Sequence, residues 1–238
     1  MKRAALAAVS ALSLAAALTA CSGNDSDTDA KSTASPSAST STAKKQVGPE
    51  ERLARLVVTK ADISGYTFKA PTKGDALAAS QDEMRVDKAA CTQLAYATNE
   101  LPIGEPEASL TRVAHNSTTM GTYVTLATYA DGKAETAMKE LSKAAASCAG
   151  GFIAKSGAGA TTYTSATAEP APSAGDQSVA AAATFQYRGA QTVRTQTFRF
   201  GDTIVNYFTI DGSAFVYGRP GSAKIPADLV KAQNAKLG

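Results

Sequence analysis

The chain of 238 residues carries 24 basic and 21 acidic residues, a formal net charge of +3, and a single histidine. No basic run stands out, so nucleic acid is not expected as a partner. After the first 20 residues no apolar run is long enough to span a membrane, and a lone histidine excludes the H-E-x-x-H zinc motif.

Residues 1–20 have the pattern of a secretory signal peptide. Two basic residues precede an apolar run over residues 4–17, which is shorter than the roughly 20 residues that a transmembrane helix needs. The run ends in LTAC at 18–21, which resembles the bacterial lipobox. That resemblance implies cleavage before Cys21 and attachment of lipid to its sulfur. The alternative is a secreted protein with a chance cysteine near its cleavage site.

The lipid on Cys21 would be the link between this protein and a membrane. One acyl chain holds a protein only marginally, whereas two or three chains on one residue hold it durably. We therefore expect the mature protein on the outer face of the cell membrane, anchored by its N-terminal lipid.

Residues 21–48 have the composition of a flexible tether. Eleven of the 27 residues in 22–48 are Ser or Thr, and none is aromatic. Such a segment buries too little surface to offset its ordering entropy, and as a coil it reaches about 30 Å. Residues 49–238 follow as a single domain that is long enough for a full core.

The cysteine count fits an exported protein. Cys21 is explained by the lipid, which leaves Cys91 and Cys148. These two can pair in an oxidising compartment, where the closed loop would stabilise the fold by about 4 kcal/mol in the chain-entropy model. The alternative is two buried thiols. Two cysteines and one histidine do not make a strong zinc site.

The first half of the domain is predicted to contain three helices and two strands. Pro49 and the acids after it start a helix that stops near Gly65, with an apolar stripe at helical spacing. A second helix is expected over 84–97. Strands follow at 109–116 and 121–129. Asp131 is expected to cap a third helix that runs to Cys148, before Gly150-Gly151.

The second half is predicted to be a meander with a final helix over 227–237. Its strands are expected at 178–188, 191–200, 203–210 and 213–217, joined by two-residue turns at 189–190, 201–202 and 211–212. The predicted fold class is therefore α+β: an antiparallel sheet of about six strands, with a C-terminal meander and helices packed mainly on one face.

Two-residue turns set the register and sort the side chains onto two faces. One face is expected to carry Phe185, Tyr187, Phe198, Phe200, Val205 and Tyr207, with Arg194 and Gln196 among them. The other is expected to carry Val193, Ile204, Phe208, Ile210, Phe215 and Tyr217, with Thr195, Thr197, Arg199 and Asn206. A half-apolar, half-polar face suits a ligand or a partner, so the candidate binding residues are Arg194, Gln196 and Tyr207. The alternative is that loops and the terminal helix cover this face.

The sequence offers no catalytic constellation. His115 is not expected to act as the base of a catalytic triad, because the chain contains no nucleophile elbow of the G-x-S-x-G type. The glycine-rich motifs that bind dinucleotides and phosphates are incomplete. Glu100, Glu105 and Glu107 lie around prolines, and Asp202 and Asp211 lie in predicted turns. No catalytic residue, metal site or cofactor is assigned.

Two segments support a family resemblance. VVTKADISGYTF at 57–68, RFGDTIVNYFTI at 199–210, and the order of elements around Cys91 and Cys148 resemble the actinobacterial PknH-like extracellular sensor domains. The resemblance implies an antiparallel sheet with helices, a cleft and disulfides, and a role in sensing or binding ligands. The chain departs from that pattern in having no tryptophan and Ser147 before Cys148.

These observations predict a membrane-anchored, non-catalytic, ligand-binding or sensor-like lipoprotein. Its partner would be an unidentified small molecule, a lipid or an envelope protein. The alternative is a protein-interaction subunit of a cell-envelope complex, and an envelope hydrolase ranks last.

Overall fold

The computed structural model describes residues 47–238, apart from positions 73, 75, 117 and 118. All of them belong to one compact unit, Lys45–Gly238. The predicted signal peptide, Cys21 and nearly all of the predicted tether lie outside the described residues. In the part of the chain that is described, no helix is both long and apolar enough to cross a membrane.

Five α-helices and two short 3-10 helices occur among the described residues. The α-helices are α1 (Pro49–Leu56), α2 (Thr92–Ala97), α3 (Lys133–Ser147), α4 (Gly212–Tyr217) and α5 (Ala227–Asn234). The 3-10 helices are η1 (Gln81–Glu83) and η2 (Ala89–Cys91). α1 begins as predicted, with proline and two acids in its first turn, but it ends at Leu56.

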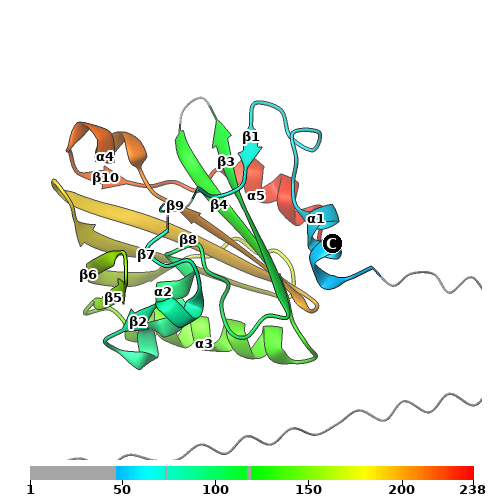
Figure 1. Ribbon diagram of the computed structural model, residues 1–238, viewed down its shortest axis with the longest axis horizontal. Coiled ribbons are helices and arrows are strands. Elements are labelled where there is room, and N and C mark those ends of the chain that lie inside the picture. Colours follow the sequence, from blue (N-terminus) through cyan, green and yellow to red (C-terminus); the bar gives the residue numbers. More distant parts are fainter. Residues whose placement is uncertain (1–46, 73, 75, 117–118) are drawn as a thin grey trace, which may run out of the picture. The chain divides into compact units, whose positions relative to one another are not determined.

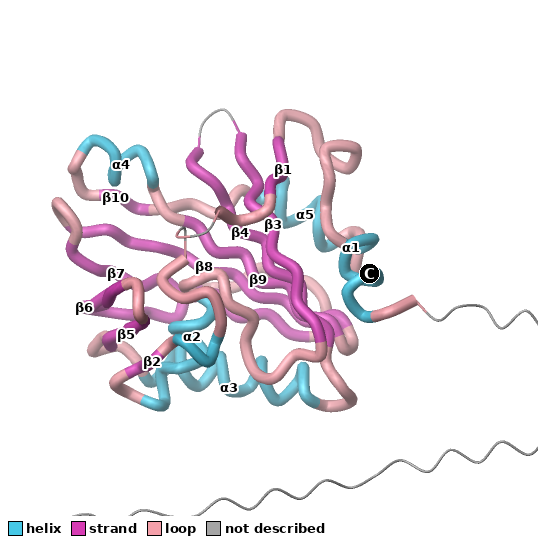
Figure 2. Tube along the Cα trace, in the orientation of Figure 1, coloured by secondary structure: helices cyan, strands magenta, loops and turns pink. Residues whose placement is uncertain are grey.

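Ten strands form one sheet (Figure 2). They are β1 (Thr67–Lys69), β2 (Arg85–Val86), β3 (Ala108–Asn116), β4 (Thr119–Thr128), β5 (Phe152–Ser156), β6 (Gly159–Glu169), β7 (Gln177–Gln186), β8 (Ala190–Phe200), β9 (Thr203–Thr209) and β10 (Gly221–Ser222). The order across the sheet is β1-β3-β4-β9-β8-β7-β6-β5-β2, with antiparallel neighbours throughout, and β10 pairs in parallel with the start of β8.

The prediction of about six strands was therefore too low. β5 and β6 lie in the stretch rich in Gly, Ala and Thr, where few bulky apolar residues mark an alternation. β1, β2 and β10 have only two or three residues each, which is too short for any periodic pattern. Partner strands hold them in place, and this is not visible in the local sequence.

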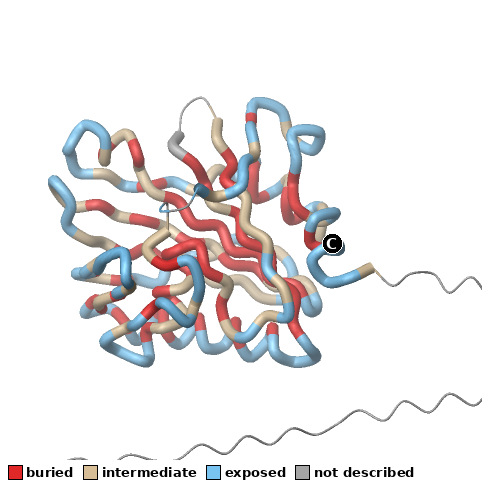
Figure 3. The backbone as a smooth tube through the Cα atoms, in the orientation of Figure 1, coloured by how far each residue is buried: buried red, intermediate tan, exposed pale blue. Residues whose placement is uncertain are grey.

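Helices cover both faces of the sheet, which corrects the prediction that they lie mainly on one face (Figure 1). α2 and α3 pack on one face with a core that includes Leu94, Leu141 and Ile204. α1 and α5 pack on the other, around Leu53 and Leu229. All seven residues of β9, in the middle of the sheet, are buried (Figure 3). Since the unit contains both cores, it has what independent folding requires.

The turn between β7 and β8 also differs from prediction. Gln186 pairs with Ala190, so the turn is Tyr187-Arg188-Gly189, and Phe185 lies opposite Gln191. A shift of one residue moves side chains to the other face. Phe185 therefore joins the core under α2 and α3. The predicted turn at 201–202 is confirmed, because Phe200 pairs with Thr203.

The predicted strand at 213–217 is in fact α4. Asp211 is the N-cap residue, and its carboxylate accepts a hydrogen bond from the Ala214 backbone N–H at 3.0 Å. Gly218 ends the helix with a φ of 61°, a conformation that favours glycine. Asp-Gly is typical of a hairpin turn, but Asp is also a strong helix cap, and here the cap prevails.

The predicted helix over 84–97 is also broken. Residues Arg85–Val86 pair with β5, and only Thr92–Ala97 are α-helical. Cys91 ends η2 and forms the predicted disulfide with Cys148, with the two Cα atoms 5.9 Å apart. α3 has no side-chain cap from Asp131, because its N-cap position is Gly132. The disulfide joins the start of α2 to the end of α3.

Candidate functional site

A cleft of about 430 Å³ opens on the sheet face that carries α2 and α3. α2 and α3 leave part of this face uncovered near α4. Five aromatic rings line the cleft: Tyr123, Tyr163, Phe185, Phe208 and Phe215. They come from β4, β6, β7, β9 and α4 in that order, so the site exists only when distant strands are paired.

The aromatic side chains form a continuous wall. The ring centroids of Phe152 and Tyr163 lie 4.6 Å apart, those of Tyr163 and Phe185 lie 5.7 Å apart, and those of Phe185 and Phe215 lie 6.0 Å apart. The ring centroids of Tyr123 and Phe208, two further lining residues on the adjacent strands β4 and β9, lie 5.6 Å apart. Tilted and edge-on ring pairs at these distances are favourable, so the wall is preformed.

The end of α2 supplies the polar part of the cleft. Asn99 is 7% exposed, and its Nδ2 donates to the Ala95 carbonyl at 2.7 Å and to the Tyr163 Oη at 3.3 Å. Its Oδ1 accepts no hydrogen bond from the described residues. The Tyr163 Oη in turn donates to the Thr98 carbonyl at 3.5 Å. An amide oxygen is thus held at the edge of an aromatic cavity, where a ligand N–H or O–H would pair with it.

Burial keeps the Tyr163 hydroxyl in its neutral form. Desolvation raises the pKa of this phenol, and hydrogen bonding with Thr98 and Asn99 opposes the shift less strongly. The hydroxyl therefore remains a proton-bearing donor at neutral pH, and the Asn99 side chain keeps its orientation.

Glu100 brings a carboxylate and a strained backbone to the same place. The residue is 7% exposed and lines the cleft. Its φ is 65°, a region that residues with a side chain seldom occupy. The Thr125 Oγ1 donates to its carbonyl at 3.0 Å, which holds the turn. Strained residues of this kind cluster at functional sites.

A buried asparagine on β9 anchors this part of the cleft to the sheet. The Asn206 Nδ2 donates to the Ala97 carbonyl at 2.9 Å, at the end of α2. The Asn206 Oδ1 accepts from the Thr195 and Thr197 hydroxyls at 2.5 and 2.8 Å. The disulfide at one end of α2 and Asn206 at the other therefore fix the residues that precede Asn99.

The sequence-predicted binding residues lie on the opposite face and do not form one site. Tyr207 is fully buried, and its hydroxyl donates to the Asn234 Oδ1 at 2.8 Å, so it belongs to the core under α5. Arg194 is paired with Glu169, with its Nε 3.0 Å from both carboxylate oxygens. This agrees with the alternative that the terminal helix covers this face.

Gln196 lines a second hollow, of about 450 Å³, between β8, α5 and residues 172–175. Its walls include the rings of Phe198 and Phe200 and the side chain of Val230. The exposed Lys231 lies at this hollow. This hollow also has a buried amide in its lining, that of Asn234, which accepts the hydrogen bond from the Tyr207 hydroxyl. It differs from the cleft on the other face in having no residue with a side chain at positive φ among its described lining residues.

Some of the residues that line the cleft were predicted from the sequence to share one face of the sheet. The prediction placed Val193, Phe208, Ile210 and Phe215 on one face, and all four line the cleft. Tyr163 and Asn99 were missed, because β6 was not recognised and because a polar residue after a helix is ordinary in a sequence. A buried asparagine becomes significant only when its partners are known.

Three other titratable residues considered in the sequence analysis lie outside the cleft, in a surface ion pair, on a strand and at a helix cap. Glu105 pairs with Lys133 at 3.0 Å on the surface, and His115 lies half-buried on β3. Asp211 caps α4, and that backbone hydrogen bond is the main reason why the pKa of its carboxyl is lowered. In the described part of the chain no group of three His, Cys, Asp or Glu residues is arranged to hold a metal ion.

The fold is that of a known extracellular domain. The chain superimposes on the crystal structure of the extracellular domain of PknH from Mycobacterium tuberculosis with a TM-score of 0.52, over 81% of this chain and 95% of that one, at 13% sequence identity. An uncharacterized Rv0999 ortholog from Mycobacterium smegmatis gives a TM-score of 0.39 over 78% of this chain and 96% of that one, at 11% identity. No protein-family model matches the sequence, and no curated protein matches it.

Proposed function

We propose that this protein is an extracytoplasmic, ligand-binding domain of the sensor type, and that the cleft between α2 and the open part of the sheet is its binding site. The observation that carries the proposal is the conjunction of five aromatic rings with the buried amide of Asn99. A mostly apolar cavity with a few fixed polar groups is the usual form of a small-molecule site.

The ligand is a small amphipathic molecule. Its apolar body would pack on Phe185, Phe208 and Phe215, and an N–H or O–H donor would bond to the Asn99 Oδ1. A cavity of about 430 Å³ lies within the range for small-molecule sites, about 300–1,000 Å³. The shared fold with an extracellular domain of PknH supports a place outside the cell.

The proposed role is binding and not catalysis. Glycoside hydrolysis uses two carboxyl groups that flank the bond, and Glu100 is the one carboxylate among the described residues of the lining. Acyl transfer uses a nucleophile next to a base, and the described lining contains no histidine or cysteine.

The proposed attachment to the membrane rests on the LTAC segment that ends at Cys21. Mass spectrometry of the protein extracted from membranes should find Cys21 as the first residue, with acyl chains on it. The Cys21→Ser variant should appear in the soluble fraction. A mature protein with an unmodified Cys21 would contradict the anchor and leave the cleft proposal untouched.

The cleft proposal is tested with Nile red, a neutral fluorescent amphiphile. Thr161 on β6 lines the cleft, whereas its neighbour Thr162 is exposed and points to the other face. Thr161→Trp should fill the cleft and weaken Nile red binding about tenfold or more, since the probe and the indole compete for one space. Thr162→Trp is the matched control and should leave binding unchanged.

The hollow beside α5 is a competing site, and the same titration separates the two. Ala235→Trp places an indole in that hollow. If Ala235→Trp abolishes binding and Thr161→Trp does not, the ligand site is beside α5 and the cleft proposal is wrong. Thermal unfolding of each variant shows whether it is folded.

A further inference from the structure

The exposed large hydrophobic side chains of the described residues gather at one place. They are Tyr187, Val216 and Tyr217, which are 43%, 64% and 76% exposed. Tyr187 lies in the turn between β7 and β8, and the other two lie in α4. We call residues 187–189 and 212–219 the α4 tip. It lies at the upper left of Figure 1, at the end of the sheet far from α1.

The α4 tip is a fixed structure. The rings of Tyr187 and Phe215 stack with centroids 4.4 Å apart and an interplanar angle of 14°. Beneath them, the buried Gln191 donates from its Nε2 to the Tyr187 carbonyl at 3.2 Å and to the Arg219 carbonyl at 2.8 Å. One side chain thus joins both halves of the tip, so the exposed side chains are displayed at a constant geometry.

The charges of the α4 tip are positive. Arg188 and Arg219 are exposed, and the Arg188 guanidinium carbon lies 5.6 Å from the centroid of the Tyr187 ring. The segments of the tip contain no acidic residue. The nearest acid along the chain, Asp211, caps α4 with its carboxylate, and its charge interacts with that of Arg219, so it offsets part of the positive charge of the tip while Arg188 stays exposed on the other segment. The tip therefore combines tyrosine and valine with two cations.

We propose that the α4 tip docks on an anionic phospholipid surface. Tyrosine is favoured at the boundary between headgroups and acyl chains, and arginine extends its charge to phosphates while its stem stays apolar. Each cation near an anionic membrane contributes to binding. Three exposed side chains fall well short of the roughly 800 Å² per partner that a stable protein interface buries, so a lipid surface is the better match.

Docking of the tip also places the cleft beside the membrane. Phe215 both lines the cleft and stacks on Tyr187. A molecule that leaves the bilayer at the tip would therefore meet the aromatic wall directly. This consequence does not depend on the anchor, and docking can be tested independently of ligand binding.

The experiment is vesicle co-sedimentation with the disulfide-bonded Lys45–Gly238 unit, which contains both cores and lacks the proposed lipid. We expect binding to vesicles of phosphatidylglycerol and phosphatidylcholine, weaker binding at high salt, and little binding to phosphatidylcholine alone. Arg188→Asn and Arg219→Gln should each weaken binding about fivefold, and Asn tolerates the positive φ of position 188. Val216→Ser combined with Tyr217→Ser should weaken it about tenfold.

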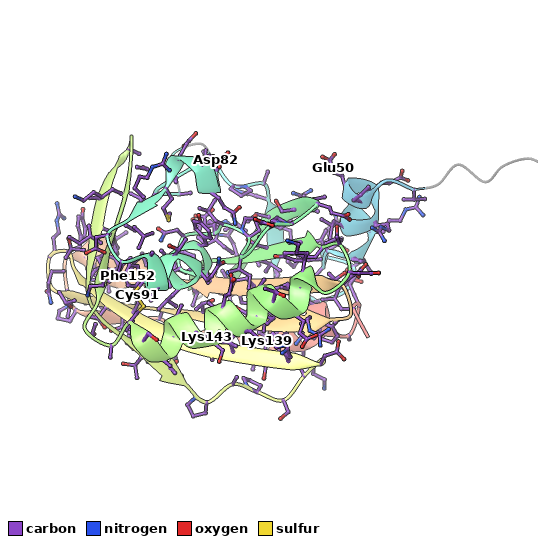
Figure 4. All side chains as sticks on the ribbon, turned by 90° about the horizontal axis from the view of Figure 1, so that it is seen from below. Glu50, Asp82, Cys91, Lys139, Lys143 and Phe152 are labelled. Atoms are coloured by element: carbon purple, nitrogen blue, oxygen red, sulfur yellow. A yellow bond between two sulfur atoms is a disulfide. The ribbon has the colours of Figure 1, made fainter. Side chains whose placement is uncertain are left out.

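The matched control is Lys143→Gln, which removes an exposed cation from the outer side of α3 (Figure 4). It should bind vesicles as the unaltered protein does. Failure to bind anionic vesicles, or equal losses for Lys143→Gln and the tip variants, would overturn the proposal. Tip variants that bind vesicles normally but lose a protein partner would overturn it in favour of a protein interface. Nile red binding in the cleft should be unchanged in the tip variants.

Discussion

At the scale of single residues, polar side chains that the sequence does not distinguish hold the site in place. Asn206 is 2% exposed and bonds to two threonines and to the end of α2. Buried polar groups are costly when one partner is removed, because the others lose their hydrogen bonds without regaining water. The fixed position of Asn99 depends on this arrangement.

Asn206→Leu should therefore lower the free energy of unfolding by about 2–4 kcal/mol, because it leaves the Ala97 carbonyl and two hydroxyls without their partner. Urea denaturation measures the loss. Thr197→Val is the control, since it removes one donor of the same group and should cost about 1 kcal/mol. Equal effects of the two variants would contradict the central role of Asn206.

Asp211 makes the stability of α4 depend on pH. Backbone hydrogen bonding to Ala214 is the main cause that lowers the pKa of this carboxyl in the folded state. The stabilisation is therefore complete above the ordinary aspartate pKa of about 3.9, and it is lost as the pH falls through the lower pKa of the folded protein. Asp211→Ala should cost about 1 kcal/mol at pH 7.

Asp211→Asn separates the cap from its charge. Its amide oxygen still accepts the Ala214 hydrogen bond, so its stability should stay close to that of the unaltered protein at pH 7. Because asparagine does not titrate, the unaltered protein should lose stability relative to Asp211→Asn as the pH falls through the lowered pKa of Asp211, so the difference between the two proteins should widen toward pH 2. Guanidinium denaturation at several pH values checks this, and an Asp211→Asn variant as unstable as Asp211→Ala would refute the capping role.

At the scale of elements, short helices keep their positions through covalent and polar links. α2 has six residues, which is too few for a stable isolated helix. The Cys91–Cys148 disulfide attaches its start to α3, across a sequence separation of 57 residues. Asn206 attaches its end to β9. The cleft residues after α2 inherit their position from both links.

Replacing both Cys91 and Cys148 by serine should lower the free energy of unfolding by about 4 kcal/mol. It should also weaken Nile red binding in the cleft, because α2 loses its attachment to α3. Chemical denaturation and the probe titration measure the two effects. Cys21→Ser lies outside the described residues and serves as the control, with no change expected in either measurement.

At the scale of the whole unit, a sheet covered on both faces requires both sets of helices. α5 holds α1 as well as the sheet: the Gln233 Oε1 accepts from the Val58 N–H at 2.7 Å, and its Nε2 donates to the Leu56 carbonyl at 3.0 Å. Leu229 is fully buried in the same core. The first and last described helices therefore stabilise each other.

Truncation after Pro226 should abolish cooperative unfolding, since the removal of α5 exposes Tyr207 and Phe198 to water. Thermal denaturation followed by circular dichroism tests this. Lys236→Gln is the control: it keeps α5 and Leu237, removes only the partly exposed Lys236–Asp62 pair, and should cost about 1 kcal/mol or less. A cooperative transition in the shorter chain would show that the second core is dispensable.

The sequence by itself determined the fold class, most of the long strands, α1, α3 and α5, and the pairing of Cys91 with Cys148. Helices and long strands can be predicted because their periodic patterns involve residues close together in the chain. The disulfide can be predicted because, once Cys21 is assigned to the lipid, only two cysteines remain to pair. The turn at 201–202 was likewise correct, because its two residues suffice to set the register.

Only the tertiary structure decided which face of the sheet carries the candidate site. Residues 187–189 make a three-residue turn, residues 212–217 form a helix, and the weakly patterned β5 and β6 bring Tyr163 beneath Asn99. Each depends on contacts between strands far apart in the chain. The physical reason is that burial and hydrogen-bond partners are properties of the assembled sheet: they made Tyr207 a core residue and Asn99 a candidate for binding.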